Sequence, residues 1–310
     1  MADNLTDMTA FVRIAETGSL SAAALELDQS LAVISRRLAR LEERLGVRLI
    51  NRTTRQLSLT DEGVAFHQRC ARILNDIEEA EVEVTKGREV AVGLLRMTST
   101  FAFARRQLAP LLHSFGAEHP GLRVHLDASD RIVNLVDEGF DVAIRFGAMA
   151  DSSLIARAIA PNAYVMCASP GYLDRKGRPE KIDDLLSHEC ILSGSPPGNR
   201  WTFEDGSSVK LRGDLSTNDG DLAHVWALEG AGIVLKSIWD VYADIHEGHL
   251  EIVLAGTRPP ATPLHAVFPH SRLAAARVRL VLDFLTKQLR AQWDEKIAML
   301  VATADPSAAS

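Results

Sequence analysis

The sequence predicts a chain of mixed α/β class, in which a small helical N-terminal domain is joined by one long helix to a larger α/β domain. Three observations support this prediction. Residues 19–60 contain two short helical patterns around a tight turn, followed by two strand-like segments. Residues 61–86 continue a single helical pattern without interruption. Beyond residue 90, short apolar strands alternate with amphipathic helices, which is typical of an α/β domain.

Length and charge limit the classes of protein to which the chain can belong. Its 310 residues are enough for about two domains. A hydrophobic fraction of 46% allows a sizeable core to be buried. The formal net charge of −7 excludes a generally basic nucleic-acid coat protein, so DNA binding must come from a local basic patch.

Cysteine spacing and the absence of targeting segments favour a cytoplasmic protein. Cys70, Cys167 and Cys190 fit no disulfide framework and no zinc site, and we interpret them as buried free thiols. The acidic N-terminus has no apolar core of a signal peptide, and no apolar run approaches the ~18–20 residues that cross a bilayer. We expect no metal, no cofactor and no membrane contact.

The N-terminal residues predict three helices in succession. The first spans about residues 5–17 and ends at Gly18. Ser19 can cap the second, whose three consecutive alanines allow close approach of a neighbouring helix. Ser30 can cap the third, which runs to Leu45 and is followed by Gly46 at the usual left-handed position.

Arginine is concentrated in the third helix and the segment after it, where residues 47–50 and 57–60 predict two strands of a wing. Between positions 35 and 55 only Glu42 and Glu43 oppose this charge. A basic helix that follows a small-residue helix and a turn is typical of a winged helix-turn-helix that enters a DNA groove. Arginines at the wing tip would reach phosphates or the minor groove. The candidate DNA contacts are Ser30, Leu31, Ala32, Ser35, Arg36, Arg37, Arg40, Arg52, Thr54 and Arg55.

The long helix after Thr60 carries a heptad pattern of apolar or small residues. A single helix with such a seam has nothing nearby against which to bury it, so we predict a dimerisation helix. The alternative is a helix that lies on the core of its own domain. The seam consists of Phe66, Cys70, Ile73, Ile77, Ala80 and Val84, and a hinge follows at 86–88.

The alternating pattern after residue 90 predicts a largely parallel sheet covered by helices. Asp205-Gly206 indicates a hairpin turn. Strands are expected near residues 94–97, 122–126, 141–144, 164–168, 190–192, 233–235 and 265–268, with helices near 103–118, 132–138 and 272–290.

The N-terminal 60 residues resemble the signature of LysR-type transcriptional regulators in order and spacing. The matching residues are Phe11, Gly18-Ser19-Leu20, Ala22-Ala23-Ala24, Leu27, Ser30, Ser35-Arg36-Arg37, Leu41-Glu42, Leu45-Gly46, Leu49, Arg52 and Thr60. Later segments such as 139–145 and 167–170 resemble a large subgroup that includes regulators of malate and related metabolism. Leu31 departs from the Pro or Gln often found there, which puts the operator sequence in doubt.

The resemblance implies an organisation and a set of partners. Residues 1–60 would form the winged domain, 61–89 the linker helix and hinge, 90–303 the effector-binding domain, and 304–310 a flexible tail. That domain would be periplasmic-binding-protein-like, with lobe I at about 90–161 and 264–303 and lobe II at about 162–263. Expected partners are promoter DNA, a small effector between the lobes, further copies of the chain in a homodimer and homotetramer, and RNA polymerase.

Residue chemistry at the expected cleft favours a carboxylate effector. Thr98-Ser99-Thr100 lies between a strand and its helix, where hydroxyls and free N–H groups bind anions. Arg145 could pair a carboxylate bidentately. The alternatives are ordinary N-cap hydroxyls and a salt bridge. The candidate effector contacts are Thr98, Ser99, Thr100, Phe101, Ser129, Arg145, Phe146, Asn218, Asp219 and Gly232.

Two other functional classes are alternatives. A transporter's solute-binding protein would share the two-lobed fold, but it needs an export signal and has no use for a basic winged domain. An enzyme needs a catalytic constellation, and no nucleophile elbow or phosphate loop is present in the sequence. His246 and His249 lack the i,i+4 spacing of a helical zinc motif. We therefore expect no catalytic residues.

Overall fold

The computed structural model describes residues 2–52, 57–86, 91–147, 154–194, 198–260, 262–272 and 275–303. Outside these residues lie the predicted positions Thr54 and Arg55, the hinge at 87–88, the tail at 304–310, and the side chains of Arg52 and Val84. The chain divides into two compact units, one of Met1–Leu94 with Asp137–Gly139 and one of Leu95–Val136 with Phe140–Ser310.

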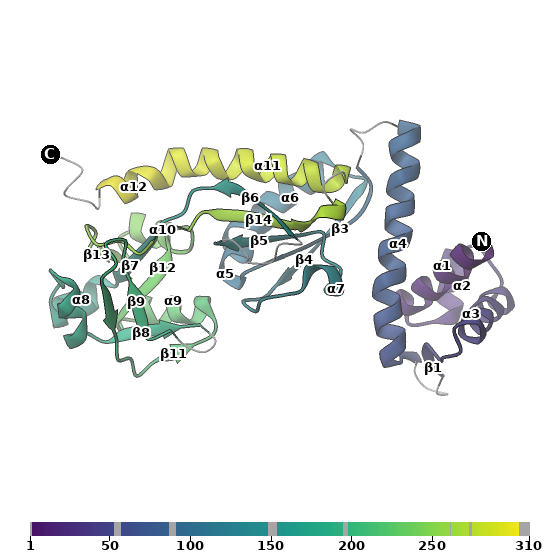
Figure 1. Cartoon of the computed structure of the whole chain (residues 1–310), viewed down its shortest axis with the longest axis horizontal. Helices are drawn as coiled ribbons and strands as arrows, with labels where there is room; N and C mark the ends of the chain where they lie inside the picture. Colours follow the sequence, from purple (N-terminus) through teal and green to yellow (C-terminus); the bar gives the residue numbers. More distant parts are fainter. Residues whose placement is uncertain are drawn as a thin grey trace. The chain divides into compact units, whose positions relative to one another are not determined.

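The N-terminal unit contains the helices and the wing that the sequence predicts, in the predicted order (Figure 1). The two strands pair antiparallel, with Ile50 opposite Leu59. The elements are α1 (Ala2–Thr17), α2 (Leu20–Glu26), α3 (Leu31–Leu45), β1 (Ile50–Arg52), β2 (Leu57–Leu59) and α4 (Asp61–Lys86).

Local capping chemistry sets the helix boundaries in this unit. The Ser19 hydroxyl accepts the N–H of Ala22, and the Ser30 hydroxyl accepts the N–H of Val33. Gly46 closes α3 with φ of 71°, a left-handed conformation that glycine adopts without steric penalty. The predicted caps are confirmed.

Glu42 of α3 joins this helix to the wing. Its carboxylate is buried and accepts the N–H groups of Leu49 and Ile50 at 2.9 and 3.2 Å. Arg48 donates to its other oxygen at 3.2 Å. A buried carboxylate is stable only with such donors, so this contact fixes where the wing begins relative to α3.

The first half of α4 packs against its own domain, which corrects part of the predicted dimerisation seam. Cys70 is 1% exposed within the core formed with α1 and α3. The Phe66 ring lies 5.7 Å from the ring of Phe11. Both positions therefore serve the alternative role, because the winged domain itself covers this face of the helix.

The second half of the predicted seam has a different environment. Ile73 is 44% exposed, Ala80 is also exposed, and Ile77 is half-buried. Exposed apolar residues at helical spacing are suited to a partner helix. The dimerisation role of these three residues stays a prediction.

The C-terminal unit contains two five-stranded sheets. The first has the order β4-β3-β5-β14-β6, and helix α11 runs alongside β14 and β6 (Figure 1). Its strands are β3 (Gly93–Ser99), β4 (Leu122–Ala128), β5 (Val142–Phe146), β6 (Leu154–Ala160) and β14 (Leu264–Pro269). Its helices are α5 (Phe101–Phe103), η1 (Ala104–Leu108), α6 (Ala109–Glu118), α7 (Leu135–Glu138), η3 (His270–Arg272), α11 (Ala276–Gln292), η4 (Trp293–Ile297) and α12 (Ala298–Thr303).

The second sheet has the order β11-β8-β12-β7-β13. A hairpin of β9 and β10 lies beside it and turns at Asp205-Gly206, as predicted. Its strands are β7 (Tyr164–Ala168), β8 (Cys190–Ser193), β11 (Ser216–Thr217), β12 (Ile233–Ser237) and β13 (Glu251–Val253), and the hairpin pairs β9 (Arg200–Thr202) with β10 (Ser208–Lys210). Its helices are α8 (Pro170–Lys176), η2 (Ile182–Ser187), α9 (Gly220–Leu228) and α10 (Ile238–His246).

Both sheets are mixed, which corrects the prediction of a largely parallel sheet. β3 pairs parallel with β5, but β14 runs antiparallel to both β5 and β6. In the second sheet β12 is antiparallel to β7 and parallel to β8. The chain leaves the first sheet between β6 and β7 and returns between β13 and β14, and these connections contain Pro161 and Pro263. The returning strand enters reversed, which alternation along the sequence cannot reveal.

Among the described helices, none combines the length and apolar character needed to span a membrane. The described residues also include no group of three or more His, Cys, Asp or Glu side chains placed to hold a metal ion.

Replacing Glu42 with alanine should loosen the start of the wing. The change leaves two buried N–H groups without an acceptor, which costs about 2 kcal/mol and corresponds to roughly 30-fold faster amide exchange. Hydrogen exchange of residues 48–51, measured by mass spectrometry, tests this. Glu43→Ala on the exposed side of α3 is the matched control. Equal protection in both variants would contradict the role of Glu42.

All three thiols are buried, and burial raises their pKa values. The pKa of Cys70 rises to about 11, and those of Cys167 and Cys190 to about 12. At pH 8 only about one thiol in a thousand with a pKa of about 11 is the reactive thiolate, and fewer with a pKa of about 12, so a polar disulfide reagent should label the folded protein very slowly. All three should react in urea. Rapid labelling of one thiol in the folded protein would contradict this.

Candidate DNA-binding surface and effector cavity

The outward face of α3 presents several of the predicted DNA contacts together. Ile34, Leu38 and Leu41 are buried on its inner face, while Leu31 and Arg36 are exposed. Ala32 is exposed and Ser35 is half-buried near the same end. Within the described part of the chain, Arg36 makes no hydrogen bond or ion pair. Its guanidinium donors are therefore not used inside the domain, and their contact with base edges or phosphates stays a prediction.

Arg37 and Arg40 have a different setting, because both are held by other residues of the domain. Arg40 donates to both oxygens of Asp7 at 2.6 and 2.7 Å. Arg37 donates to Gln29 at 3.1 Å and lies 3.6 Å from Asp7. The sequence predicted all three arginines as DNA contacts, and the structure places Arg37 and Arg40 in a different setting from Arg36. Asp7, on α1, was not identified from the sequence.

The C-terminal unit has a cavity of about 690 Å³ lined by residues of both sheets. Its size suits a small organic molecule. Six of the predicted effector contacts line it: Thr100, Phe101, Ser129, Phe146, Asn218 and Asp219. The remaining lining residues are Ala102, Asp130, Arg131, Tyr164, Ser193, Gly194, Gly220, Leu235, Lys236, Ser237 and Asp240.

Three predicted contacts in lobe I are used inside the fold instead of lining the cavity. Ser99 is fully buried and donates to the carbonyl of Ile144. Arg145 donates to the carbonyl of Ser129 at 2.6 Å and to the hydroxyl of Thr98 at 3.2 Å. Burial lowers the pKa of Arg145. Thr98, Ser99 and Arg145 thus brace the strand ends beneath the cavity.

Gly232 is also absent from the cavity wall. A Cβ atom at this position would collide with the backbone carbonyl of Glu189. The glycine therefore allows close approach of two backbone segments next to β8 and β12. Its prediction as an effector contact is corrected to this packing role.

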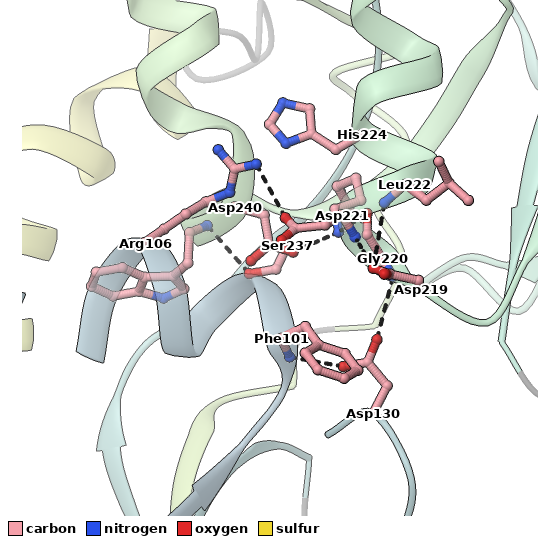
Figure 2. Close-up of polar contacts among 12 residues, drawn as sticks. Phe101, Arg106, Asp130, Asp219, Gly220, Asp221, Leu222, His224, Ser237 and Asp240 are labelled. Carbon is pink, nitrogen blue, oxygen red and sulfur yellow. Dashed lines mark hydrogen bonds and ion pairs between the residues drawn. The ribbon is translucent and has the colours of Figure 1, made fainter. Parts of the chain in front are cut away.

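Asp130 was not identified from the sequence, although its side chain connects lobe I to lobe II at the cavity. One carboxylate oxygen accepts the N–H of Phe101 at 3.0 Å, and the other accepts the N–H of Gly220 at 3.3 Å. Figure 2 shows its side chain reaching both segments. These residues begin α5 and α9, where backbone N–H groups point out of the helix. No motif marks Asp130, because its partners lie far away in the sequence.

Lys236 and Asp240 form an ion pair on the lobe II wall of the cavity. Their charged atoms are 2.7 Å apart, and both side chains are more than nine-tenths buried. Lys236 also donates to the carbonyl of Gly220 at 3.1 Å. One oxygen of Asp240 has no hydrogen-bond partner among the described residues. The cavity thus has a buried ammonium group close to the start of α9.

A second charged contact joins the lobes outside the cavity. Arg105 and Arg106 pair with Asp221 at 2.8 and 3.1 Å (Figure 2 shows Arg106). Burial would raise the pKa of Asp221, but hydrogen bonds and charges from the two arginines outweigh it and lower this pKa. The carboxylate therefore stays ionised at neutral pH, and the contact persists.

Comparison with known proteins agrees with both parts of this geometry. Residues 5–64 match the model of the bacterial regulatory helix-turn-helix protein, lysR family, and residues 88–290 match the LysR substrate binding domain. The chain is 37% identical to the HTH-type transcriptional regulator DmlR of Escherichia coli (strain K12), over 91% of this chain and 93% of that protein.

A solved structure of a LysR-type regulator is also similar to this chain. The structure of CrgA, a LysR-type transcriptional regulator from Neisseria meningitidis, has a TM-score of 0.61 at 37% identity. The match covers 92% of this chain and 98% of that chain.

Substitution of Arg36 by alanine should weaken binding to a selected duplex by ~1–3 kcal/mol, because a bidentate base contact has about this value. Fluorescence anisotropy with a duplex selected from a random pool by the wild-type protein measures the effect. Arg44→Ala is the matched control, since it removes an equal exposed charge near the other end of α3. Equal losses in both variants would show that Arg36 acts by charge alone.

The winged helix-turn-helix, the two-lobed domain with its cavity and the matches over nearly the whole chain lead to one conclusion: the protein belongs to the LysR family of DNA-binding transcriptional regulators, which are not enzymes.

Proposed function

We propose that a small carboxylate binds in the cavity between the lobes and controls how paired winged domains contact promoter DNA. The observation that carries this proposal is the position of Asp130. Its carboxylate already accepts N–H groups from both lobes at the cavity, so the protein contains an internal example of the chemistry that we assign to the effector.

Two features of the cavity support an anionic ligand. The N–H groups of Phe101 and Gly220 stand at helix starts, where the backbone favours negative charge. Lys236 places a buried ammonium group on the same wall, where it donates to the Gly220 carbonyl and its charge is balanced by the ion pair with Asp240. An effector carboxylate that replaced Asp130 would find the same donors.

Replacement of the Asp130 carboxylate by the effector carboxylate would link effector binding to a change in the relative position of the lobes. Asp130 is itself exposed, so its side chain can swing into water with little loss. The part of the effector beyond its carboxylate group would also contact Phe146 and Tyr164, which line the same cavity. These additional contacts would favour one relative position of the lobes and so shift the population of the domain.

We further propose that the chain dimerises through the second half of α4, around Ile73, Ile77 and Ala80, and assembles into a tetramer. The exposed apolar surface there supports this. Two winged domains could then read half-sites separated by one helical turn of DNA or a multiple. Contact with RNA polymerase and a cytoplasmic location belong to the same proposal.

The resemblance to regulators of malate and related metabolism stays a prediction, because neither the matched models nor the relatives' names specify an effector. The proposal is therefore limited to the carboxylate class.

A thermal-shift screen of the full-length protein tests the carboxylate class. Small carboxylates should raise the unfolding midpoint, while the corresponding carboxamides, such as benzamide beside benzoate, should not, because a neutral amide gains less from helix N-termini. Equal shifts by acid and amide, or no shift by any carboxylate, would contradict the proposal.

Asp130→Asn should raise the affinity for a carboxylate found in this screen by about tenfold, since the competing internal carboxylate is removed. Isothermal titration calorimetry measures this. Glu118→Gln, an equal change of charge at an exposed site in lobe I, is the matched control and should leave the affinity unchanged. An unchanged affinity in Asp130→Asn would place the effector elsewhere in the cavity.

A further inference from the structure

We infer that Asp7 is a positioning residue for DNA recognition. It makes the protein selective by holding Arg37 and Arg40 of α3, the recognition helix of the winged domain. Asp7 belongs to α1, outside the helix-turn-helix formed by α2 and α3. Its side chain is only 2% exposed. This inference concerns the winged domain and is independent of the proposed effector.

The contact with Arg40 has the geometry of a strong ion pair. Nε of Arg40 donates to one oxygen of Asp7 at 2.7 Å, and Nη2 donates to the other at 2.6 Å. Two parallel hydrogen bonds of this kind fix the plane of the guanidinium as well as its position. Arg40 remains 48% exposed, so its orientation is set while part of it still faces solvent.

Arg37 completes the arrangement from the preceding turn of α3. Its Nη1 lies 3.6 Å from the Asp7 carboxylate, and its Nε donates to Gln29 at 3.1 Å. Residues from α1 and from the turn thus hold two neighbouring arginines of α3. Arg37 is 21% exposed, less than half the value for Arg40.

Burial makes this arrangement persistent. An ionised carboxylate removed from water is costly unless donors surround it, so releasing Arg40 would leave Asp7 poorly compensated. The arginines are therefore ordered before DNA arrives, which lowers the conformational entropy lost on binding.

The ion pairs of Asp7 also change the charge of the surface that faces DNA. Asp7 places one negative charge against two guanidinium groups, so it lowers the positive charge of this surface by one unit. Contacts with phosphates supply most non-specific affinity, through release of counterions. Asp7 thus weakens non-specific binding to DNA. Arg36, on the outward face of α3, has no acidic partner among the described residues and keeps its full charge for base contacts.

A purely structural role, in which Asp7 only fastens α1 to α3, makes a different prediction. It would affect folding and affinity for every DNA sequence equally. A positioning role changes the ratio of affinities for specific and random DNA, and it changes the dependence on salt. These two measurements separate the roles.

The experiment uses the full-length protein, a duplex selected from a random pool by the wild-type protein, and a random-sequence duplex of the same length. Binding is measured by fluorescence anisotropy over a series of KCl concentrations. In Asp7→Asn, binding to random DNA should become tighter, with a plot of log K against log salt steeper by about one unit. The ratio of affinities should fall by about tenfold.

Asp28→Asn is the matched control, because it makes the same change of charge at an exposed position of the same domain. It should change the affinity for both duplexes by the same factor and leave their ratio unaltered. In an Arg40→Gln background, Asp7→Asn should change the ratio by less than about twofold, since the main partner is gone.

Circular dichroism establishes whether each variant is folded. If Asp7→Asn does not fold, Arg40→Lys replaces it, because lysine keeps the charge but loses the bidentate geometry. The ratio should then fall in the same direction. An unchanged ratio and salt slope in the folded variant, or changes equal to those of Asp28→Asn, would overturn the inference.

Discussion

A carboxylate that is removed from water must be surrounded by donors, and this constraint organises both units of the protein. Glu42 accepts two backbone N–H groups and thereby fixes the start of the wing. Asp7 does the same for the arginines of the recognition helix. In the C-terminal unit, buried Asp141 accepts the N–H of Arg96 and pairs with Arg277. The contacts of Asp7 and Asp141 join segments that are distant in the sequence, whereas Glu42 joins α3 to the wing that follows it directly.

The acids that bridge the lobes differ from these buried carboxylates. Asp130 is exposed and Asp221 is partly buried, and the arginines that pair with Asp221 are themselves open to solvent. The exposed pairs are where a ligand could alter the relation between the lobes at low energetic cost.

Much of the N-terminal fold could be predicted because its signals are local. Ser19 and Ser30 cap the helices that they precede, and Gly46 ends the recognition helix, since each acts on neighbours a few residues away. The heptad pattern correctly indicated a long helix with an apolar face, but periodicity does not show which part of the protein or which partner covers that face. Cys70 meets the core of its own domain, and Ile73 does not.

By itself, the sequence determined the family, the order of elements and the segments that meet at the cavity, because these follow from local pattern and from the ends of strands. Only the tertiary structure decided which side chains face the cavity. Thr100 and Phe101 line it, while Ser99, on the strand just before them, turns into the sheet. Only the fold could bring Asp130 to Gly220, or Asp7 to Arg40, because such pairs depend on how distant segments pack. For the same reason, equal arginines in one helix acquired different roles.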